Sequence, residues 1–170
     1  KDKGVIEYLN SSNYFSDDKN IKFYLAGNLD QSNPSKIKKN EFKNLLELSN
    51  VKYLGHITNI HKIMNKYDCI VLPSYREGLS KTLLEAGVSG VPSITTDVPG
   101  CKDIIKNKVN GLICKPKSVK SLVNSINIFL NLNYKEKKML SEKSVEIIKR
   151  KFNQDKILKN YYKKIINVSK

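Results

Sequence analysis

Apolar residues gather in short runs and in helically spaced sets that alternate along most of the chain. Short runs rich in Val, Ile, Leu and aromatic residues predict buried strands. They lie at Ile21–Gly27, Val51–Gly55, Asp68–Leu72, Val91–Thr95 and Val109–Ile113. Between these runs, apolar residues recur every three or four positions, which predicts helices. The helices are expected at Lys3–Phe15, Lys36–Ser49, Ile60–Tyr67 and Lys81–Ser89.

The last third of the chain carries only the helical pattern. Helices are predicted at Ser118–Leu132, Tyr134–Phe152 and Gln154–Val168, with Ser118 and Asn153 as N-caps. Between the earlier elements, the pair Ile104-Ile105 fits either a helical turn or the start of a strand.

Alternating strands and helices with short connections are typical of parallel β-α units, so a doubly wound, Rossmann-like α/β sheet is predicted. The whole chain, residues 1–170, is expected to form one domain whose residues 118–170 make a helical C-terminal extension. A doubly wound domain usually opens with a strand, whereas this chain opens with a helix. One strand is therefore expected to be missing upstream.

Composition narrows the class of protein. The 170 residues include 39% hydrophobic residues, and no apolar run approaches the ~18 residues that would suggest a membrane span. Three cysteines at wide spacings form neither a disulfide framework nor a zinc pattern, which favours a reducing cytoplasm. The first residues lack both a Met and a signal peptide, so the chain is expected to begin inside a longer protein.

The formal net charge of +15 favours anionic partners. Nucleic acid is not expected, because the chain has no RNA-binding aromatic signature and no Arg-rich block. Phosphorylated ligands and a peripheral contact with an anionic membrane remain open, as does genome composition, since Lys, Asn and Ile are all abundant.

One stretch, Pro73–Glu85, combines the features of a ligand site. It leads from a predicted buried strand into a predicted helix, which is where parallel sheets bind ligands. Gly78 allows close approach to the backbone, and the helix start offers N–H donors to a diphosphate. Glu77 and Glu85 are carboxylates that would accept hydrogen bonds from ribose and sugar hydroxyls, although a Glu on a helix is also often a plain surface residue. Arg76 either lines this cleft or pairs with a carboxylate.

These residues resemble the E-x7-E motif of the family 4 retaining glycosyltransferases. Further stretches resemble landmarks of that family in the same order and together span nearly the whole chain: Lys3-Gly4, Leu25-Ala26-Gly27, Tyr53-Leu54-Gly55-His56, Thr96-Asp97-Val98-Pro99-Gly100 and Asn110-Gly111-Leu112. The resemblance implies a GT-B enzyme, and this chain is similar to its C-terminal, donor-binding half. The first strand and the N-terminal, acceptor-binding domain are then expected to lie outside the chain.

The resemblance also implies residue roles. Glu77 would hold the donor sugar, Glu85 the ribose, and Lys3 the diphosphate, so that Lys3 and Glu77 are the candidate catalytic residues. The remaining donor-binding candidates are Gly78, Leu79, Ser80, Lys81 and Thr82, which would bind phosphate and ribose, and Gly55 and His56, which would frame the base. Lys3 and His56 also fit ordinary exposed positions.

The fragment Asn33-Pro34-x-x-Ile37 and the sequence Ser74-Tyr75-Arg76-Glu77-Gly78-Leu79 resemble the subgroup of that family that acts on undecaprenyl-diphosphate sugars. This resemblance implies a UDP-sugar donor and a lipid-linked or polysaccharide acceptor in bacterial surface glycan synthesis. No metal or other cofactor is expected. The resemblance implies a GT-B enzyme of a kind that generally needs no metal, and the chain contains no D-x-D pair. The isolated chain is expected to bind nucleotide weakly and to transfer no sugar. Two alternatives stay open: another GT-B enzyme, such as a sugar-nucleotide epimerase or a glycogen-type synthase, and a non-catalytic nucleotide-binding module.

Overall fold

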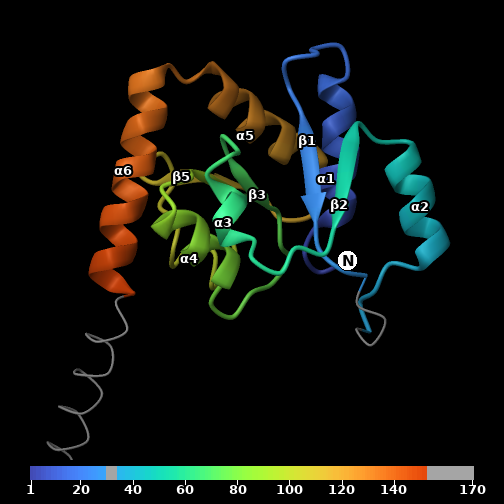
Figure 1. Ribbon diagram of the computed structural model, residues 1–170, viewed down its shortest axis with the longest axis horizontal. Helices are drawn as coiled ribbons and strands as arrows, with labels where there is room; N and C mark the ends of the chain where they lie inside the picture. The colour runs from blue at the N-terminus through green and yellow to red at the C-terminus, as the bar shows by residue number, and fades with distance from the viewer. Residues whose placement is uncertain (30–33, 153–170) are drawn as a thin grey trace, which may run out of the picture.

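The computed structural model describes residues 1–29 and 34–152 as short parallel strands flanked by helices (Figure 1). The strands are β1 (Phe23–Ala26), β2 (Val51–Gly55), β3 (Ile70–Leu72), β4 (Ser93–Thr96) and β5 (Gly111–Cys114). The helices are α1 (Val5–Ser12), α2 (Lys39–Glu47), α3 (His61–Met64), α4 (Lys81–Val88), α5 (Val119–Asn131) and α6 (Tyr134–Lys151), with a 3-10 turn at Asn13–Phe15. Every predicted strand and helix within the described residues is present, so the predicted α/β class is confirmed.

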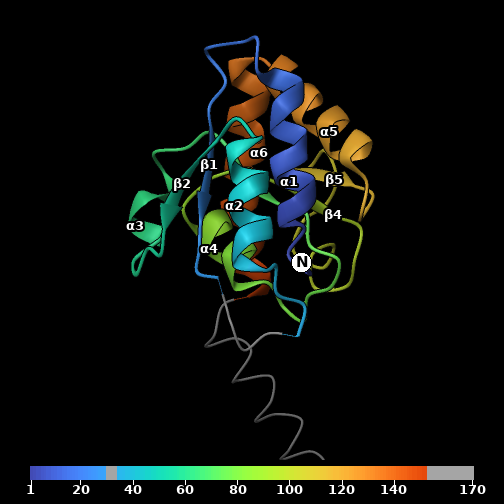
Figure 2. The same ribbon diagram turned by 90° about the vertical axis from the view of Figure 1, so that its right-hand side faces the viewer.

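Helices cover the strands on two faces. On one face, α1 and α2 lie side by side (Figure 2) and, together with α5, pack over an apolar core that includes Leu9, Phe42, Phe129 and strand residues. On the other face, α3, α4 and α6 enclose Met64 and Leu83 with their neighbours. Strands buried on both faces read as continuous apolar runs, which is the pattern that the sequence shows.

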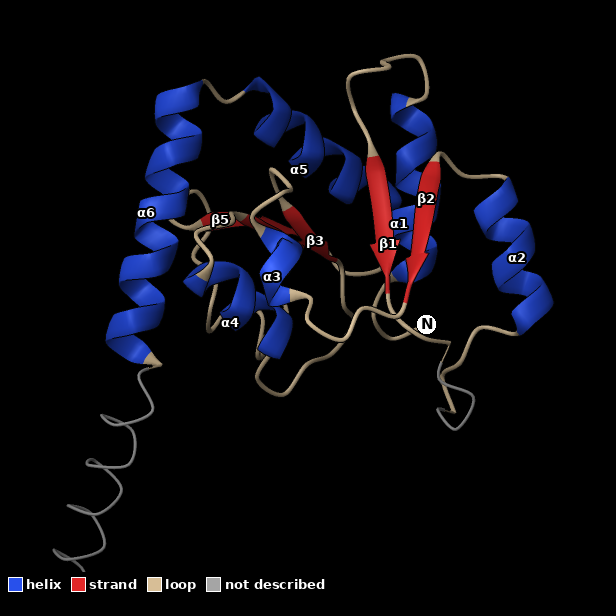
Figure 3. Cartoon of the chain, viewed as in Figure 1, coloured by secondary structure: helices blue, strands red, loops and turns tan. Residues whose placement is uncertain are grey.

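The hydrogen-bonded sheet is interrupted, at a place that the sequence did not indicate. Strand β1 pairs with β2, and β3, β4 and β5 form a second sheet in that order, all in parallel. Figure 3 shows β1 and β2 as a pair set apart from β3. The two sheets end in edge strands, β1 and β3, that flank one apolar cavity.

Several predicted boundaries shift by one to three residues for local reasons. Helix α2 begins at Lys39, not at Lys36, because Lys38 is extended (φ −62°, ψ 144°) and the preceding Ile37 is buried outside the helix. The pair Ile104-Ile105 forms a hydrogen-bonded turn, since both amides donate to the carbonyl of Cys101. The buried Asn110 side chain closes that turn by donating to Ile104 O at 3.1 Å.

The helical extension follows the prediction as far as it is described. Ser118 caps α5 by accepting from Ser121 N, as predicted. Helix α6 begins with a capping box in which Asn133 and Glu136 bind each other's backbone N–H groups. The predicted cap at Asn153 and helix Gln154–Val168 lie outside the described residues. Across residues 1–29 and 34–152, no helix has the length and apolar character needed to cross a bilayer.

Candidate functional site

The loop Pro73–Ser80 lies at the carboxyl edge of the strands and leads into α4. Ser80 is the N-cap, with Oγ accepting from Leu83 N at 3.4 Å and its carbonyl from Leu84 N at 3.1 Å. The amides of Lys81 and Thr82 belong to the first turn, where an α-helix offers its own N–H groups no carbonyl partner. This helix start therefore presents donors and the positive end of a dipole at the sheet edge.

Glu77 lies beneath this edge with its side chain only 9% exposed. Its Oε1 accepts from Ser74 Oγ at 2.8 Å and from Lys3 Nζ at 2.7 Å. The Lys3 side chain is 61% exposed, so its ammonium lies between the shielded Glu77 carboxylate and solvent. The structure thus brings the two candidate catalytic residues into direct contact.

Asp2 fastens the chain start to the same loop. Asp2 Oδ2 accepts from Arg76 through two nitrogens, at 2.7 and 2.9 Å, and Asp2 O accepts from Tyr75 N at 2.7 Å. A hydrogen bond from the Ser35 side chain and then the Arg76 guanidinium lower the pKa of Asp2. Of the two roles predicted for Arg76, the structure shows pairing with a carboxylate.

Tyr75 connects the loop to α1, a contact that sequence reasoning missed. Its hydroxyl donates to Glu7 Oε1 at 2.6 Å. Burial, followed by the hydrogen bond to Glu7, raises the pKa of Tyr75. Glu7 Oε2 is buried and has no hydrogen-bond partner among the described residues. Lys117 Nζ lies 5.2 Å from the centre of the Tyr75 ring, within cation–π range.

Two glycines are required where backbones meet around the loop. Gly100 has a φ of 77°, and a Cβ there would overlap the Gly78 carbonyl. Gly4 has a φ of 68°, and a Cβ there would overlap the Pro73 carbonyl. A Cβ on Gly78 itself would meet no described atom within 4 Å. Packing within the described residues therefore demands glycine at positions 4 and 100 and does not demand it at position 78.

Glu85 lies on the second turn of α4, with its side chain 24% exposed. Its neighbours on the helix, Leu83 and Ala86, are fully buried, so the carboxylate lies at the border of the apolar face. Lys81 Nζ approaches Glu85 Oε1 to 3.6 Å. Leu79, before the N-cap, is 54% exposed. Glu85 is thus half-buried beside the exposed Lys81 ammonium. This position fits either a residue that binds a ligand or an ordinary residue on the helix surface.

Gly55 is the last residue of β2, which pairs in parallel with β1, and His56 follows it at the carboxyl end of the strand. Gly55 has a φ of 69° and its carbonyl accepts from Gly27 N at 2.8 Å. His56 is exposed, and among the described residues no hydrogen bond or ion pair joins it to Lys3 or Glu77. Its role in framing a base stays a prediction.

The arrangement suits an anionic ligand that also carries hydroxyl groups. An exposed ammonium and a helix N-terminus favour phosphate, and two half-buried carboxylates accept from hydroxyls. Within the part of the chain that the structure describes, no group of three His, Cys, Asp or Glu side chains gathers in a way that would hold a metal ion.

Comparison with known proteins decides the family. Residues 1–146 match the family model described as Glycosyl transferases group 1. The chain belongs to this family. This confirms the resemblance drawn from the sequence motifs.

Two curated relatives of this glycosyltransferase chain come from bacteria. It is 37% identical over 128 residues to the N,N'-diacetylbacillosaminyl-diphospho-undecaprenol alpha-1,3-N-acetylgalactosaminyltransferase of Campylobacter jejuni, covering 75% of this chain and 32% of that protein. It is 30% identical over 132 residues to the capsular polysaccharide biosynthesis glycosyltransferase CapM of Staphylococcus aureus, covering 77% of this chain and 34% of that protein. The chain therefore spans about a third of the length of these relatives.

Solved structures show the same fold. Anabaena HepE, crystallised in complex with UDP, superimposes with a TM-score of 0.83 at 19% identity over 98% of this chain and 46% of that one. The C-terminal domain of the group 1 glycosyl transferase LpcC of Francisella tularensis superimposes with a TM-score of 0.76 at 19% identity, covering 90% and 81%. The glycosyltransferase chain thus has the Rossmann-like fold of one half of a GT-B enzyme.

Proposed function

We propose that this chain is the donor-binding half of a retaining glycosyltransferase that takes a sugar from a nucleotide-sugar. The observation that carries the proposal is the contact between Lys3 and Glu77 at 2.7 Å, at the carboxyl edge and beside the start of α4. The exposed Lys3 ammonium offers a binding group for phosphate, and the shielded Glu77 carboxylate beside it offers one for sugar hydroxyls.

The charges of the reaction match these groups. Breaking a sugar–phosphate bond builds negative charge on the leaving diphosphate and positive charge on the sugar. Lys3 and the first-turn amides of α4 stabilise the diphosphate, and Glu77 holds the sugar hydroxyls in position. Glu85 accepts from the ribose hydroxyls, Leu79 to Thr82 contact phosphate and ribose through their backbone, and Gly55 and His56 border the base.

The donor is proposed to be a UDP-sugar and the acceptor a lipid-linked or polysaccharide glycan. Support comes from the Campylobacter jejuni relative and from the UDP-Gal:alpha-D-GlcNAc-diphosphoundecaprenol alpha-1,3-galactosyltransferase of Escherichia coli, 32% identical over 73 residues. A net charge of +15 suits a reaction at the cytoplasmic face of an anionic membrane. Transfer requires the full-length protein, and residues 1–170 alone are expected to bind nucleotide without transferring sugar.

The test uses the full-length protein with a panel of UDP-, GDP- and ADP-sugars. Heat protection and binding titration identify the nucleotide, and transfer is then followed with the sugar that binds best. Glu77→Gln is expected to abolish transfer while leaving the affinity for UDP itself within about threefold, since UDP carries no sugar. Wild-type transfer by Glu77→Gln would refute the site, and binding without transfer in the wild type would favour a nucleotide-binding module.

A glycogen-type synthase is the alternative with a specific observation behind it. The chain is 28% identical over 82 residues to the glycogen synthase of Mycobacterium tuberculosis, covering 20% of that protein. A growing glucan acting as acceptor in the full-length assay would favour this reading over a lipid-linked acceptor.

A further inference from the structure

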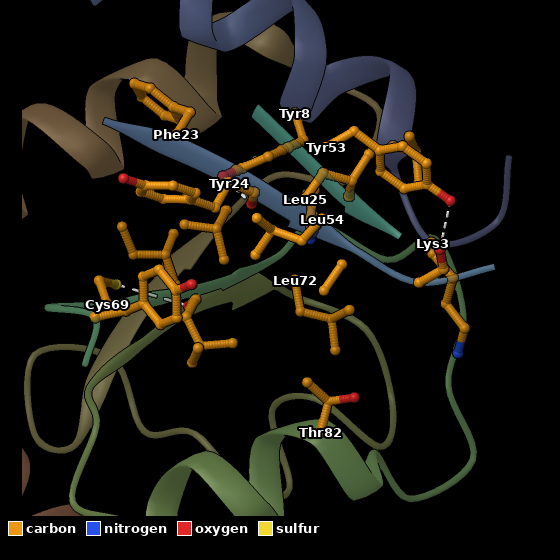
Figure 4. Close-up of a pocket in the computed structure, with 18 of the residues that line it drawn as sticks. Lys3, Tyr8, Phe23, Tyr24, Leu25, Tyr53, Leu54, Cys69, Leu72 and Thr82 are labelled. Atoms are coloured by element: carbon orange, nitrogen blue, oxygen red, sulfur yellow. Dashed lines mark hydrogen bonds between the residues drawn. The ribbon is translucent and has the colours of Figure 1, made fainter. Parts of the chain in front are cut away.

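The start of the described chain forms a tight turn that carries Asp2 and Lys3 side by side. Gly4 N donates to Lys1 O at 2.8 Å, which closes the turn. Figure 4 shows Lys3 at one end of the apolar cavity that β1 and β3 flank, with Cys69 at the other end. Because the Lys3 side chain is largely exposed there, the position of its ammonium depends on the turn that carries it and on polar contacts.

The loop after β3 carries a complementary pair of charges. Arg76 Nη2 lies 2.7 Å from Asp2 Oδ2. At the next position of both segments, Lys3 Nζ lies 2.7 Å from Glu77 Oε1, so the second ion pair has the opposite polarity. Tyr75 N also donates to Asp2 O at 2.7 Å, which joins the two backbones beside the charges. A shift of either segment by one residue would oppose like charges, so the charges define how the segments align.

The contact between Arg76 and Asp2 fixes an orientation more than it adds stability. Nε and Nη2 of Arg76 both donate to Asp2 Oδ2, at 2.9 and 2.7 Å, which restricts the plane of the guanidinium. The Arg76 side chain is nevertheless 80% exposed, and that of Asp2 is 27% exposed. Ion pairs that are open to solvent change stability little. This pair is therefore better suited to aligning the turn with the loop than to holding the fold together.

Alignment matters because Lys3 and Glu77 have separate tasks in the proposed reaction. Stabilisation of the diphosphate and positioning of the sugar both depend on geometry, and a misplacement of about 1 Å can lower a rate about a hundredfold. Lys3 directly follows Asp2 in the sequence, and Glu77 directly follows Arg76. A displacement within the Asp2–Arg76 pair is therefore transmitted to each of the two groups through a single peptide unit.

We propose that Asp2 and Arg76 are positioning residues, which hold Lys3 and Glu77 in alignment for sugar transfer without binding the donor themselves. This inference rests on the proposed function and adds two residues to it. Since the pair acts through its sequence neighbours, its loss lowers the rate of transfer more than it lowers affinity for the donor or stability.

The test measures kcat, the donor KM and urea unfolding for the full-length wild type, Arg76→Met and Asp2→Ala. Each variant is expected to lower kcat, counted per UDP-binding site, by about tenfold or more. The donor KM should stay within about threefold, and the folding equilibrium constant within about fivefold. Arg150→Met is the matched control, since Arg150 is exposed near the end of α6 and its loss changes the net charge equally. It should leave kcat and KM at their wild-type values.

Two further variants separate alignment from a general disturbance of the loop. Asp2→Asn keeps an oxygen that can accept from Arg76, so it is expected to retain about a third or more of the wild-type kcat. The double variant Asp2→Ala/Arg76→Met should be about as active as either single variant, because either substitution already breaks the pair. Losses that multiply in the double variant would show that the two residues act separately and would overturn the proposal.

The remaining outcomes distinguish this inference from the proposed function. Wild-type kcat in Arg76→Met, beside an inactive Glu77→Gln, would overturn the positioning role and leave the proposed function intact. A loss confined to the donor KM would overturn it as well, because it would show direct binding of the donor by Arg76. So would a far larger loss of stability, which would show that the pair holds the fold. If the wild type transfers no sugar from any donor, the proposed function fails and the positioning role fails with it.

Discussion

Lys3 Nζ lies 2.7 Å from Glu77 Oε1, although 74 positions separate the two residues in sequence. The same Oε1 accepts from Ser74 Oγ, so the carboxylate is held by one local and one distant donor. A diphosphate that recruits Lys3 must share or replace this ion pair. In the proposed site, the pair would therefore link binding of the diphosphate by Lys3 to the freedom of the Glu77 carboxylate.

Replacing Lys3 with Met is expected to raise the UDP dissociation constant of the full-length protein by about ten- to a hundredfold. The reason is loss of one charge-assisted hydrogen bond, about 1.5–3 kcal/mol. Isothermal titration calorimetry at two salt concentrations measures the UDP dissociation constant. The affinity of Lys3→Met for UDP should also depend less on salt than that of the wild type. Lys43→Met is the matched control, since Lys43 is 74% exposed and pairs with Glu47 on the same helix at 3.7 Å. Equal UDP affinity of wild type and Lys3→Met would contradict the assigned role.

Gly100→Ala and Gly78→Ala are expected to fail in different ways. A Cβ on Gly100 overlaps the Gly78 carbonyl and requires an unfavourable φ of 77°, so unfolding free energy should fall by more than about 2 kcal/mol. A Cβ on Gly78 meets no described atom within 4 Å, so stability should change by less than about 1 kcal/mol while donor affinity falls.

Urea unfolding and a UDP-sugar titration separate these two glycine variants. A Gly100→Ala protein of wild-type stability would refute the packing argument. A Gly78→Ala protein with wild-type donor affinity would remove Gly78 from the site.

Tyr75→Phe should destabilise the protein more than an ordinary hydroxyl deletion. It leaves Glu7 with a buried Oε2 that already lacks a partner among the described residues and an Oε1 that has lost its donor. The expected cost is about 1–3 kcal/mol, and a double-mutant cycle with Glu7→Gln should give a coupling of about 1 kcal/mol or more. Tyr53→Phe serves as control, because its hydroxyl donates to Gly27 O at an exposed position and its loss should cost less. If the effects of Tyr75→Phe and Glu7→Gln on the unfolding free energy are additive, the hydrogen bond between Tyr75 and Glu7 does not contribute to stability.

Alkaline pH should weaken the fold partly through Cys114. Burial raises the pKa of this thiol from 9.0 to about 11, so the folded state holds the proton more tightly than the unfolded state. The associated stability is complete below pH 9 and is lost as pH rises through 11. Urea unfolding at several pH values should show a shallower loss between pH 9 and 11 in Cys114→Ala than in wild type. Parallel curves for the two proteins would rule out this contribution.

The sequence pattern predicted the elements well because each buries a continuous or helically spaced apolar set. The α4 start is the clearest case, since the Ser80 cap and the buried Leu83 and Ala86 are local features. Boundaries were less accurate where an apolar residue is buried outside a helix, as Ile37 is. The gap between β1 and β3 was not foreseen, because strand order depends on pairing between distant segments.

The candidate site shows the same division. Glu77, Glu85 and the helix start lie within one stretch, and this stretch together with the order of the other motifs indicated a candidate site. The contacts of Asp2 with Arg76 and of Glu7 with Tyr75 depend on how α1 packs against the loop, and no local pattern encodes that packing. The requirement for glycine at position 100 likewise appears only when two loops meet.

Contacts between the chain start and the Tyr75–Glu77 loop also set the order in which the site assembles. At typical synthesis rates, Glu77 is made about 4–15 s after Lys3. During that interval Asp2, Lys3 and Glu7 have no access to their partners on the loop. Closing a chain loop of this span costs conformational entropy, so we expect the candidate site to form after α1 and β1 have packed locally.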